Sequence, residues 1–247
     1  MTLAGRHALV TGASGGIGAA VAEAIGRDGA AGVTLAGRCQ ARLEPVAERV
    51  RATGARAATL VADLTDPAAI ASALGHAGAF DVVVHAAGAN VPEPFLDVSA
   101  ATADRLWALN VRAGLLVSQH ASRTLIEQRR GGTIVFLSSQ MGHVGAKDRT
   151  VYCATKHAVE GLTKAMAVEL APHGIRVVAV APTFIRTPMT EPFLRDERFA
   201  EAVRRQMPLG RIGEPADVAE AVVFLASDRA SLTTGCSLLV DGGWTAH

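Results

Sequence analysis

Cysteine is scarce in this chain of 247 residues, and its three copies, Cys39, Cys153 and Cys236, lie far apart. Their spacing matches neither a disulfide framework nor a set of zinc ligands, so we expect a reducing compartment and no metal site. Positive charge is not in excess either, because 24 basic residues against 23 acidic ones leave a net charge of +1. Without a basic run, the sequence does not favour a nucleic-acid partner.

Long apolar runs are missing as well. No stretch approaches the length needed to cross a bilayer, and the N-terminal residues enter a strand pattern without an apolar targeting segment. We therefore expect a soluble, cytoplasmic protein.

Aromatic residues make up only 4% of the chain against 49% hydrophobic residues, so the core must be built mostly from Ala, Val, Leu and Ile. Such a composition suits a sheet that is tightly covered by helices.

Short apolar runs alternate with longer, alanine-rich helical patterns along the whole chain. We predict strands at residues 7–10, 33–36, 57–61, 81–85, 133–138, 175–181 and 237–240. Helical patterns lie between them, at residues 19–27, 41–53, 100–130, 155–170 and 215–225. This alternation requires crossover connections, and it predicts one α/β domain over residues 1–247 with a mainly parallel sheet covered on both faces.

One irregular zone, residues 183–213, is rich in proline and charge. Open α/β sheets bind their ligands beyond the carboxyl ends of the strands, and this zone follows the sixth predicted strand. We expect it to form a substrate lid, since long loops in compact domains usually have a function. The alternative is a surface excursion without a role.

A glycine-rich turn follows the first predicted strand. Gly12, Gly16 and Gly18 in Thr11-Gly-Ala-Ser-Gly-Gly-Ile-Gly would let the backbone turn tightly and approach a pyrophosphate. The N-terminus of the next helix would stabilise that anion. A turn of this kind could be only a helix cap, but its place between the first strand and the first helix favours phosphate binding.

The second predicted strand ends in Leu35-Ala36-Gly37-Arg38, with no acidic residue to accept hydrogen bonds from a ribose 2′-OH. Gly37 leaves room for a 2′-phosphate, and the planar guanidinium of Arg38 could hold it. The alternative is an arginine on a solvated loop. We predict a preference for NADP(H) over NAD(H).

The next two strand ends carry weaker indications. Asp63, ahead of Leu64, either touches the adenine or caps the helix that begins near Pro67. The fourth strand ends in His85-Ala86-Ala87-Gly88, whose small residues permit close approach of a cofactor. We interpret His85 as a packed histidine rather than a catalyst.

Candidate catalytic residues lie in the second half of the chain. Tyr152 is the only tyrosine, and Lys156 follows four residues later, on the same face of a predicted helix. A neighbouring ammonium favours the phenolate, which would lower the pKa of the phenol from about 10. Ser139 closes the fifth strand and could donate to a substrate carbonyl. Asn110, a polar residue within the long helical pattern, is a further candidate. The alternatives are that Tyr152 is a packing tyrosine beside a surface lysine and that Asn110 is an exposed helical residue.

Together, Thr11-Gly-x-x-x-Gly-x-Gly18, Asn110, Ser139 and Tyr152-x-x-x-Lys156 resemble the short-chain dehydrogenase/reductase superfamily of the compact, single-domain type. The resemblance covers essentially the whole chain, through Gly161 and Pro182 to the terminal Val-Asp-Gly-Gly. It implies a Rossmann-type, doubly wound α/β domain with a seven-stranded parallel sheet, usually assembled as a homotetramer or dimer.

The resemblance also implies roles for individual residues. Tyr152 would be the acid/base, Lys156 its pKa-lowering partner and a ribose ligand, and Ser139 the donor to the carbonyl oxygen. Asn110 would hold a water that links Lys156 to solvent. The cofactor positions, from the resemblance and the arguments above, are Gly12, Ser14, Gly16, Ile17, Gly18, Gly37, Arg38, Asp63, Leu64, Ala87, Gly88, Tyr152, Lys156, Pro182, Ile185 and Thr187.

Two departures from the family pattern stand out. His85-Ala86 replaces a pair of asparagines, which removes amides that support the neighbouring strand. Thr183 replaces a glycine after Pro182, which puts a hydroxyl near the nicotinamide.

We therefore predict an NADP(H)-dependent oxidoreductase that interconverts a ketone and a secondary alcohol. The residues expected around the substrate are Gln140, His143, Arg149, Thr183 and Phe184. Their polar character favours a hydroxylated small molecule such as a sugar, a polyol or a hydroxy acid. One alternative is a 3-oxoacyl thioester carried on an acyl carrier protein, which lid arginines would suit. Another is a sensor that binds NADP(H) without chemistry, although such a module would not need all four catalytic residues.

Overall fold

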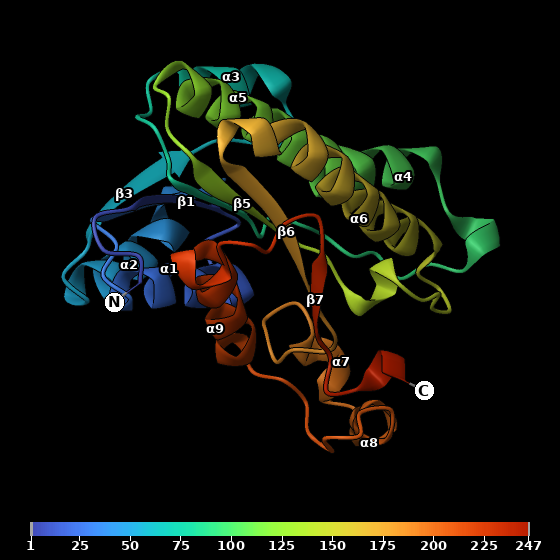
Figure 1. Cartoon of the computed structure of the whole chain (residues 1–247). Coiled ribbons are helices and arrows are strands. Elements are labelled where there is room, and N and C mark those ends of the chain that lie inside the picture. Colours follow the sequence, from blue (N-terminus) through green and yellow to red (C-terminus); the bar gives the residue numbers. More distant parts are fainter. Residues whose placement is uncertain (1, 247) are drawn as a thin grey trace.

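Seven parallel strands form a single sheet within residues 2–246, the part of the chain that the computed structural model describes (Figure 1). The strands are β1 (His7–Thr11), β2 (Gly32–Gly37), β3 (Arg56–Val61), β4 (Val82–His85), β5 (Gly132–Leu137), β6 (Ile175–Pro182) and β7 (Ser237–Val240). Their order in the sheet is β3-β2-β1-β4-β5-β6-β7, and every pairing is parallel. The predicted doubly wound α/β fold is confirmed.

Helices cover both faces of this sheet. Along the chain, the α-helices are α1 (Gly16–Arg27), α2 (Gln40–Ala52), α3 (Pro67–Gly75), α4 (Ala100–Trp107), α5 (Ala113–Glu127), α6 (Thr150–Leu170), α7 (Glu191–Leu194), α8 (Glu197–Arg205) and α9 (Pro215–Ala226), of which α7 and α8 lie away from the sheet. Figure 1 shows α1, α2 and α9 below the sheet and α3, α5 and α6 above it. No helix within residues 2–246 is long and apolar enough to span a membrane.

Two hydrophobic cores result from the alternation of side chains along the strands. Val82 and Val84 of β4 pack into the core shared with α1, α2 and α9, whereas Val83 between them packs toward α3, α5 and α6. Both faces are therefore dry, which explains why the strands are continuous apolar runs rather than alternating ones.

The helical pattern predicted at residues 100–130 is interrupted in its middle. A π-helical turn, η2 (Ala108–Arg112), joins α4 to α5 without a break in the helical backbone. Single π-helical turns occur frequently at functional sites because they change which residues face inward. Here the turn carries Asn110, which is 6% exposed.

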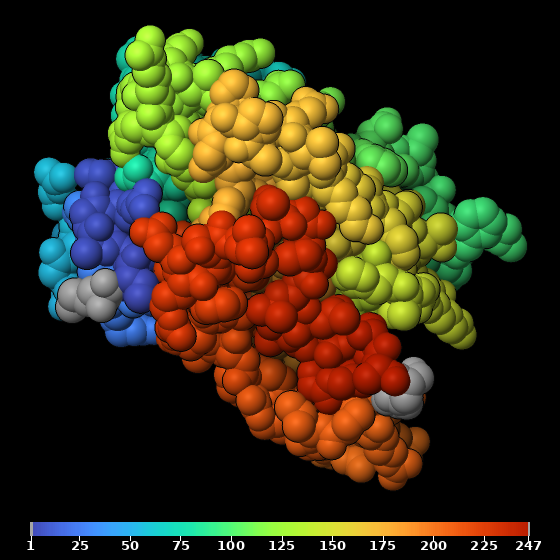
Figure 2. Space-filling model, in the orientation of Figure 1, coloured from blue at the N-terminus to red at the C-terminus, as the bar shows by residue number. Residues whose placement is uncertain are grey.

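The zone at residues 183–213 leaves the carboxyl end of β6 and contains α7 and α8. It has a small hydrophobic core of its own, formed by Leu194, Ala200, Val203, Met207 and Ile212, against which Phe184, Phe199 and Trp244 pack. Figure 2 shows this segment in orange at one end of the molecule, with the C-terminal segment in red beside it. Trp244 therefore ties the C-terminal segment to this zone.

Candidate active site

The strand order reverses direction between β1 and β4, because the chain runs outward from β1 through β2 to β3 and then returns to continue from β4. Ligands of open α/β sheets bind beyond the carboxyl ends of the strands at such a switch point. A cleft of about 390 Å³ opens there.

Most of the predicted cofactor positions line this cleft. They are Gly12, Ser14, Gly16, Ile17, Gly18, Gly37, Arg38, Asp63, Leu64, Ala87, Gly88 and Thr187. Pro182, Ile185, Tyr152 and Lys156 do not line it. Ile185 is 3% exposed and packs in the core shared with α1 and α9. It does not line the cleft, so its predicted contact with the cofactor stays a prediction.

The sequence reading missed several lining residues. They are Gly15, Arg42, Ala62, Thr65, Ala86, Leu109, Pro188 and Met189. Arg42, in the first turn of α2, is a second arginine that lines the cleft besides Arg38. Its position in α2, four residues from Arg38, was visible in the sequence.

The glycines of the turn are required by packing within the protein. A Cβ on Gly12 would lie 2.6 Å from the backbone nitrogen of Ala87, and one on Gly18 would lie 2.4 Å from the carbonyl oxygen of Gly12. Gly12 also has φ +67°, which L side chains rarely adopt. At Gly15, the N-cap of α1, no side chain caps the helix, so its first N–H groups remain available to an anion. This cradle fits the pyrophosphate of a dinucleotide.

Asp63 lines the cleft as well. Its carboxylate accepts hydrogen bonds from the Thr65 backbone nitrogen (2.9 Å) and hydroxyl (2.8 Å), and the backbone bond is the main reason why the pKa of Asp63 is lowered. The cap of α3 is Asp66, which accepts from the backbone nitrogen of Ala68 at 2.8 Å. The alternative that Asp63 caps this helix is therefore wrong.

The candidate catalytic residues meet beside the cleft. Ser139 and Lys156 are 7% and 5% exposed, and Tyr152 lies half-buried in the first turn of α6. A Cβ on Gly88, which lines the cleft, would lie 3.4 Å from Asn110 Oδ1 and 3.8 Å from Lys156 Nζ. The structure thus brings the end of β4, the π-helical turn and α6 together at one point.

Tyr152 titrates differently from the prediction. Burial raises the pKa of Tyr152 to about 12, against the opposite effects of the Ser139 hydroxyl and the charge of Arg149. Burial also lowers the pKa of Lys156 to about 8, and its ammonium donates to the Leu137 carbonyl at 2.7 Å. The expectation that the pKa of Tyr152 lies below about 10 is wrong for this structure, because desolvation of the phenol dominates. At neutral pH the phenol carries its proton.

Asn110 uses its whole side chain to fix the backbone around it. Its Oδ1 accepts from the Ala89 backbone nitrogen (2.8 Å), and its Nδ2 donates to the Ala89 carbonyl (2.9 Å) and the Thr155 hydroxyl (3.1 Å). The alternative of an exposed helical residue is wrong. These bonds tie the loop after β4 to α6, and any water held here would have to use other atoms of the residue.

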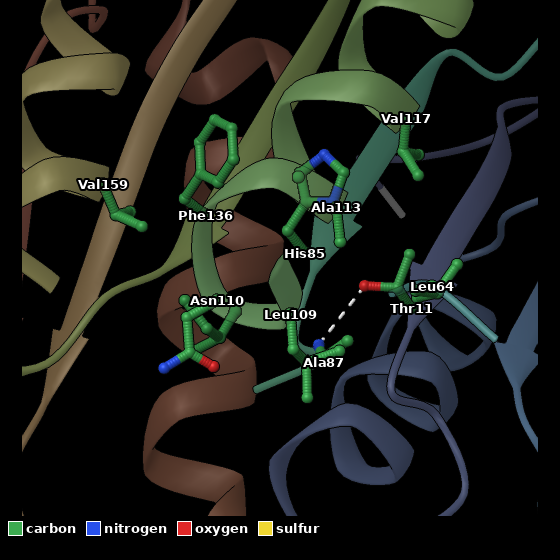
Figure 3. A pocket seen from close by; sticks show the side chains of 12 residues that line it. Thr11, Leu64, His85, Ala87, Leu109, Asn110, Ala113, Val117, Phe136 and Val159 are labelled. Carbon is green, nitrogen blue, oxygen red and sulfur yellow. Dashed lines mark hydrogen bonds between the residues drawn. The ribbon is translucent and has the colours of Figure 1, made fainter. Parts of the chain in front are cut away.

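His85 is a packed histidine, as interpreted from the sequence. Its ring stacks on Phe136 at 4.7 Å between centroids, its Nε2 lies 2.8 Å from the Ser118 hydroxyl, and burial lowers its pKa to about 3. Figure 3 shows this ring above Ala87 and Thr11, whose hydroxyl accepts from the Ala87 nitrogen at 3.3 Å. The small cavity in between, about 10 Å³, is close to the smallest space that holds one water.

Two of the predicted substrate residues have partners within the protein. The imidazole Nε2 of His143 lies 3.2 Å from the Glu160 carboxylate, and the ring of Phe184 packs against Phe199 and Trp244 at 5.6 and 5.7 Å. The other three, Gln140, Arg149 and Thr183, each keep a buried polar atom without a hydrogen-bond partner within residues 2–246.

Known proteins resemble the chain over its whole length. A family model described as "Enoyl-(Acyl carrier protein) reductase" matches residues 12–245. L-xylulose reductase from Bos taurus is 42% identical over 246 residues, which cover 100% of this chain and 99% of that protein.

Solved structures share the fold closely. A short-chain type dehydrogenase/reductase from Mycobacterium marinum is 38% identical, with a TM-score of 0.93 over 99% of this chain and 97% of that one. A gluconate 5-dehydrogenase from Burkholderia cenocepacia J2315, in complex with NADP and tartrate, is 30% identical, with a TM-score of 0.94 over the same shares of the two chains.

Proposed function

Because the chain belongs to the short-chain dehydrogenase/reductase family, we propose that it interconverts a ketone and a secondary alcohol on a polyhydroxylated substrate, with NADP(H) as the redox partner. The relatives named above act on xylulose and gluconate, which share a chain of hydroxylated carbons. The observation that carries the proposal is the convergence of Ser139, Tyr152 and Lys156 beside the nucleotide cleft.

The cleft residues and Lys156 would hold the dinucleotide, whose nicotinamide supplies or accepts the hydride when it is bound. In the reducing direction, the Tyr152 hydroxyl donates its proton to the carbonyl oxygen of the substrate. The Ser139 hydroxyl donates a hydrogen bond to the same oxygen as negative charge develops on it. The Lys156 ammonium, buried one helical turn from Tyr152, favours the phenolate that remains.

Steady-state kinetics with NADPH and a panel of ketoses, sugar acids and simple ketones test this proposal, repeated with NADP and the alcohols. Tyr152→Phe should lower kcat by about 10²- to 10⁴-fold, because general acid–base catalysis contributes that much. NADPH binding, followed by fluorescence titration, should remain. Substantial residual kcat in this variant would contradict the role of Tyr152.

The preference for NADP(H) is supported by the end of β2. Arg38 and Arg42 both line the cleft, and no acidic residue stands between Val33 and Arg38. Two guanidinium groups favour a 2′-phosphate over a 2′-OH. Arg38→Ala should lower kcat/KM for NADPH about tenfold or more and leave NADH nearly unchanged, whereas a wild-type preference for NADH would contradict the proposal.

The lid role of residues 183–213 has one specific support. Thr187, Pro188 and Met189 from its beginning line the nucleotide cleft, and the rest of the zone packs on its own small core. A segment of this kind can move as a unit. Hydrogen exchange of its amides should slow when NADPH and a substrate analogue are both added.

A 3-oxoacyl thioester is the second candidate substrate, because the matching family model is described by an acyl carrier protein activity. Two of the four arginines at residues 195–205 argue against it. Arg204 and Arg205 form ion pairs with Glu197 and Glu201, so their charges are already compensated. Turnover of an acetoacetyl thioester faster than that of any ketose would favour this candidate.

Assembly as a homotetramer or dimer is supported by apolar side chains that remain exposed on one protomer. They include Val168 of α6, Phe224 of α9, and Leu238 and Leu239 of β7. β7 is also an edge strand of the sheet, and such edges are usually covered. Light scattering coupled to gel filtration should give a mass of two or four chains.

A further inference from the structure

Buried polar atoms without partners gather on one side of the catalytic residues. Seven side-chain atoms within residues 2–246 are buried and lack a hydrogen-bond partner: Asn90 Oδ1, Glu93 Oε2, Ser122 Oγ, Ser138 Oγ, Gln140 Oε1, Arg149 Nε and Thr183 Oγ1. All except Ser122 lie in the segments that follow the carboxyl ends of β4, β5 and β6. Because native proteins pair nearly all such atoms with protein groups or ordered water, this concentration marks a place where a polar ligand would find several hydrogen-bond partners.

Glu93 and Arg149 are the two charged members of this set, and one turn holds both. The Asp148 carbonyl accepts a hydrogen bond from the Glu93 backbone nitrogen at 3.1 Å and another from Arg149 Nη1 at 3.0 Å. Asp148 has φ +57°, a conformation that a non-glycine residue keeps only when its surroundings hold it. The loop after β4 is thereby joined to the start of α6.

Arg149 lies between the phenol and the lid. It precedes Tyr152 by three residues as the N-cap of α6, and its charge acts on the pKa of Tyr152. Its guanidinium carbon is 5.9 Å from the centre of the Phe193 ring in α7. A group bound by Arg149 would therefore be close to a substrate whose oxygen meets Tyr152.

Neither Glu93 nor Arg149 forms a salt bridge within the described residues, although the neighbouring Asp148 carboxylate acts on the Arg149 charge. Among residues 2–246, no ion pair within 4.0 Å joins Glu93 or Arg149 to any side chain, although both reach the same turn. Arg149 Nη1 donates to the Asp148 carbonyl, but Arg149 Nε and Glu93 Oε2 are buried without a partner, which is unfavourable for atoms of charged groups. Glu93 thus keeps one free acceptor and Arg149 one free donor, in two residues that meet at the Asp148 carbonyl.

We propose that Glu93 and Arg149 form a subsite for the hydroxyl groups of a neutral polyhydroxylated ketone, beyond its reacting carbonyl. Arg149 donates to one hydroxyl oxygen, and Glu93 accepts the proton of another. A vicinal diol offers both functions at once, whereas a carboxylate would be repelled by Glu93 and an alkyl chain would leave both charges unpaired. The inference rests on the proposed function and specifies its substrate class.

The test compares two ketones with the same carbon chain and the same reacting α-hydroxyketone group. Xylulose carries hydroxyls on its remaining carbons, and 1-hydroxy-2-pentanone does not. Glu93→Gln and Arg149→Gln should each lower kcat/KM for xylulose roughly 10- to 100-fold, since each removes a hydrogen bond to a charged group. Glu93→Gln should keep kcat/KM for 1-hydroxy-2-pentanone within about threefold of the wild type. Arg149→Gln also removes a charge that acts on Tyr152, so it should lower kcat/KM for both ketones, but for xylulose at least tenfold more than for 1-hydroxy-2-pentanone.

Two exposed residues without ion pairs give matched controls, Glu48→Gln and Arg123→Gln, which should leave both ketones unaffected. Thermal melts show whether each variant folds, and Arg149→Lys should recover part of the activity on xylulose. Equal losses on both ketones, or no loss on either, would overturn the subsite.

A keto acid of the same length completes the design. If the wild type prefers it to xylulose and only Arg149→Gln removes that preference, the subsite binds a carboxylate and the neutral substrate is refuted. If the wild type reduces none of these compounds with NADPH, the proposed function fails, and the subsite fails with it. A wild type that reduces xylulose beside variants without a selective loss refutes the subsite alone.

Discussion

Acid should destabilise this protein through His85. The residue is 6% exposed, stacks on Phe136 and contacts Ser118, and burial lowers its pKa from 6.5 to about 3. Between these two values the unfolded chain binds a proton at this position and the native protein does not, so stability falls as the pH falls below about 6.5. Above that value the imidazole is neutral in both states and contributes no pH dependence.

The size of the effect follows from the two pKa values. One pH unit corresponds to about 1.4 kcal/mol for a single proton, so lowering the pH from 7.5 to 5.0 should cost about 2 kcal/mol through His85 alone. His85→Asn keeps a polar side chain and cannot take up this proton. The variant will be less stable than the wild type at pH 7.5 because the smaller side chain leaves a void, but its loss between pH 7.5 and 5.0 should be about 2 kcal/mol smaller.

Urea unfolding at the two pH values, followed by circular dichroism at one protein concentration, gives both differences. His173→Asn is the matched control, because this histidine is exposed in a turn before β6, and the variant should keep the pH dependence of the wild type. An identical pH dependence in wild type and His85→Asn would refute the reasoning, as would an NMR titration of His85 with a midpoint near 6.

Three further predictions concern the site itself. Gly12→Ala should abolish NADPH binding and lower the free energy of unfolding by about 1–3 kcal/mol, because the added Cβ would lie 2.6 Å from the Ala87 backbone at φ +67°. In the same urea unfolding experiment, the control Gly161→Ala should not be destabilised, because its added Cβ would have no atom within 4 Å. Asn110→Ala removes three hydrogen bonds and should cost about 2–3 kcal/mol in urea unfolding together with a drop in kcat, so a fully stable and active variant would refute the role given to this amide. The reduction rate should fall as the pH rises past about 8, where Lys156 loses its charge. No second fall should follow below about pH 11, since the pKa of Tyr152 is raised to about 12. A profile that is flat from pH 7 to 10 would contradict the part assigned to Lys156.

Much of the fold was predictable because local periodicity encodes it. Each strand lies within two residues of its predicted bounds, since strands buried on both faces are unbroken apolar runs. The helices α7 and α8 were not predicted, and α3 was expected only as the helix that Asp63 could cap. They are short, and α7 and α8 lie in a segment whose prolines and charges hide any helical period.

The candidate site was predictable as a set of residues but not as a physical environment. The spacing of Tyr152 and Lys156 places both on one helix face wherever that helix packs, and the glycine turn is confined to a few neighbouring residues. The titration of Tyr152, by contrast, depends on how much protein surrounds the phenol. Sequence reasoning predicted a lowered pKa from the neighbouring amine, and burial produces a raised one.

By itself, then, the sequence determined the parallel sheet, the dinucleotide turn and the family, because each of these depends on residues that are close together in the chain. The tertiary structure alone decided that Gly12 serves the approach of Ala87, that Asn110 joins the loop after β4 to α6, and that Glu93 meets Arg149 at one carbonyl. These contacts join segments separated by tens of residues, and their energies depend on burial, which no local pattern encodes.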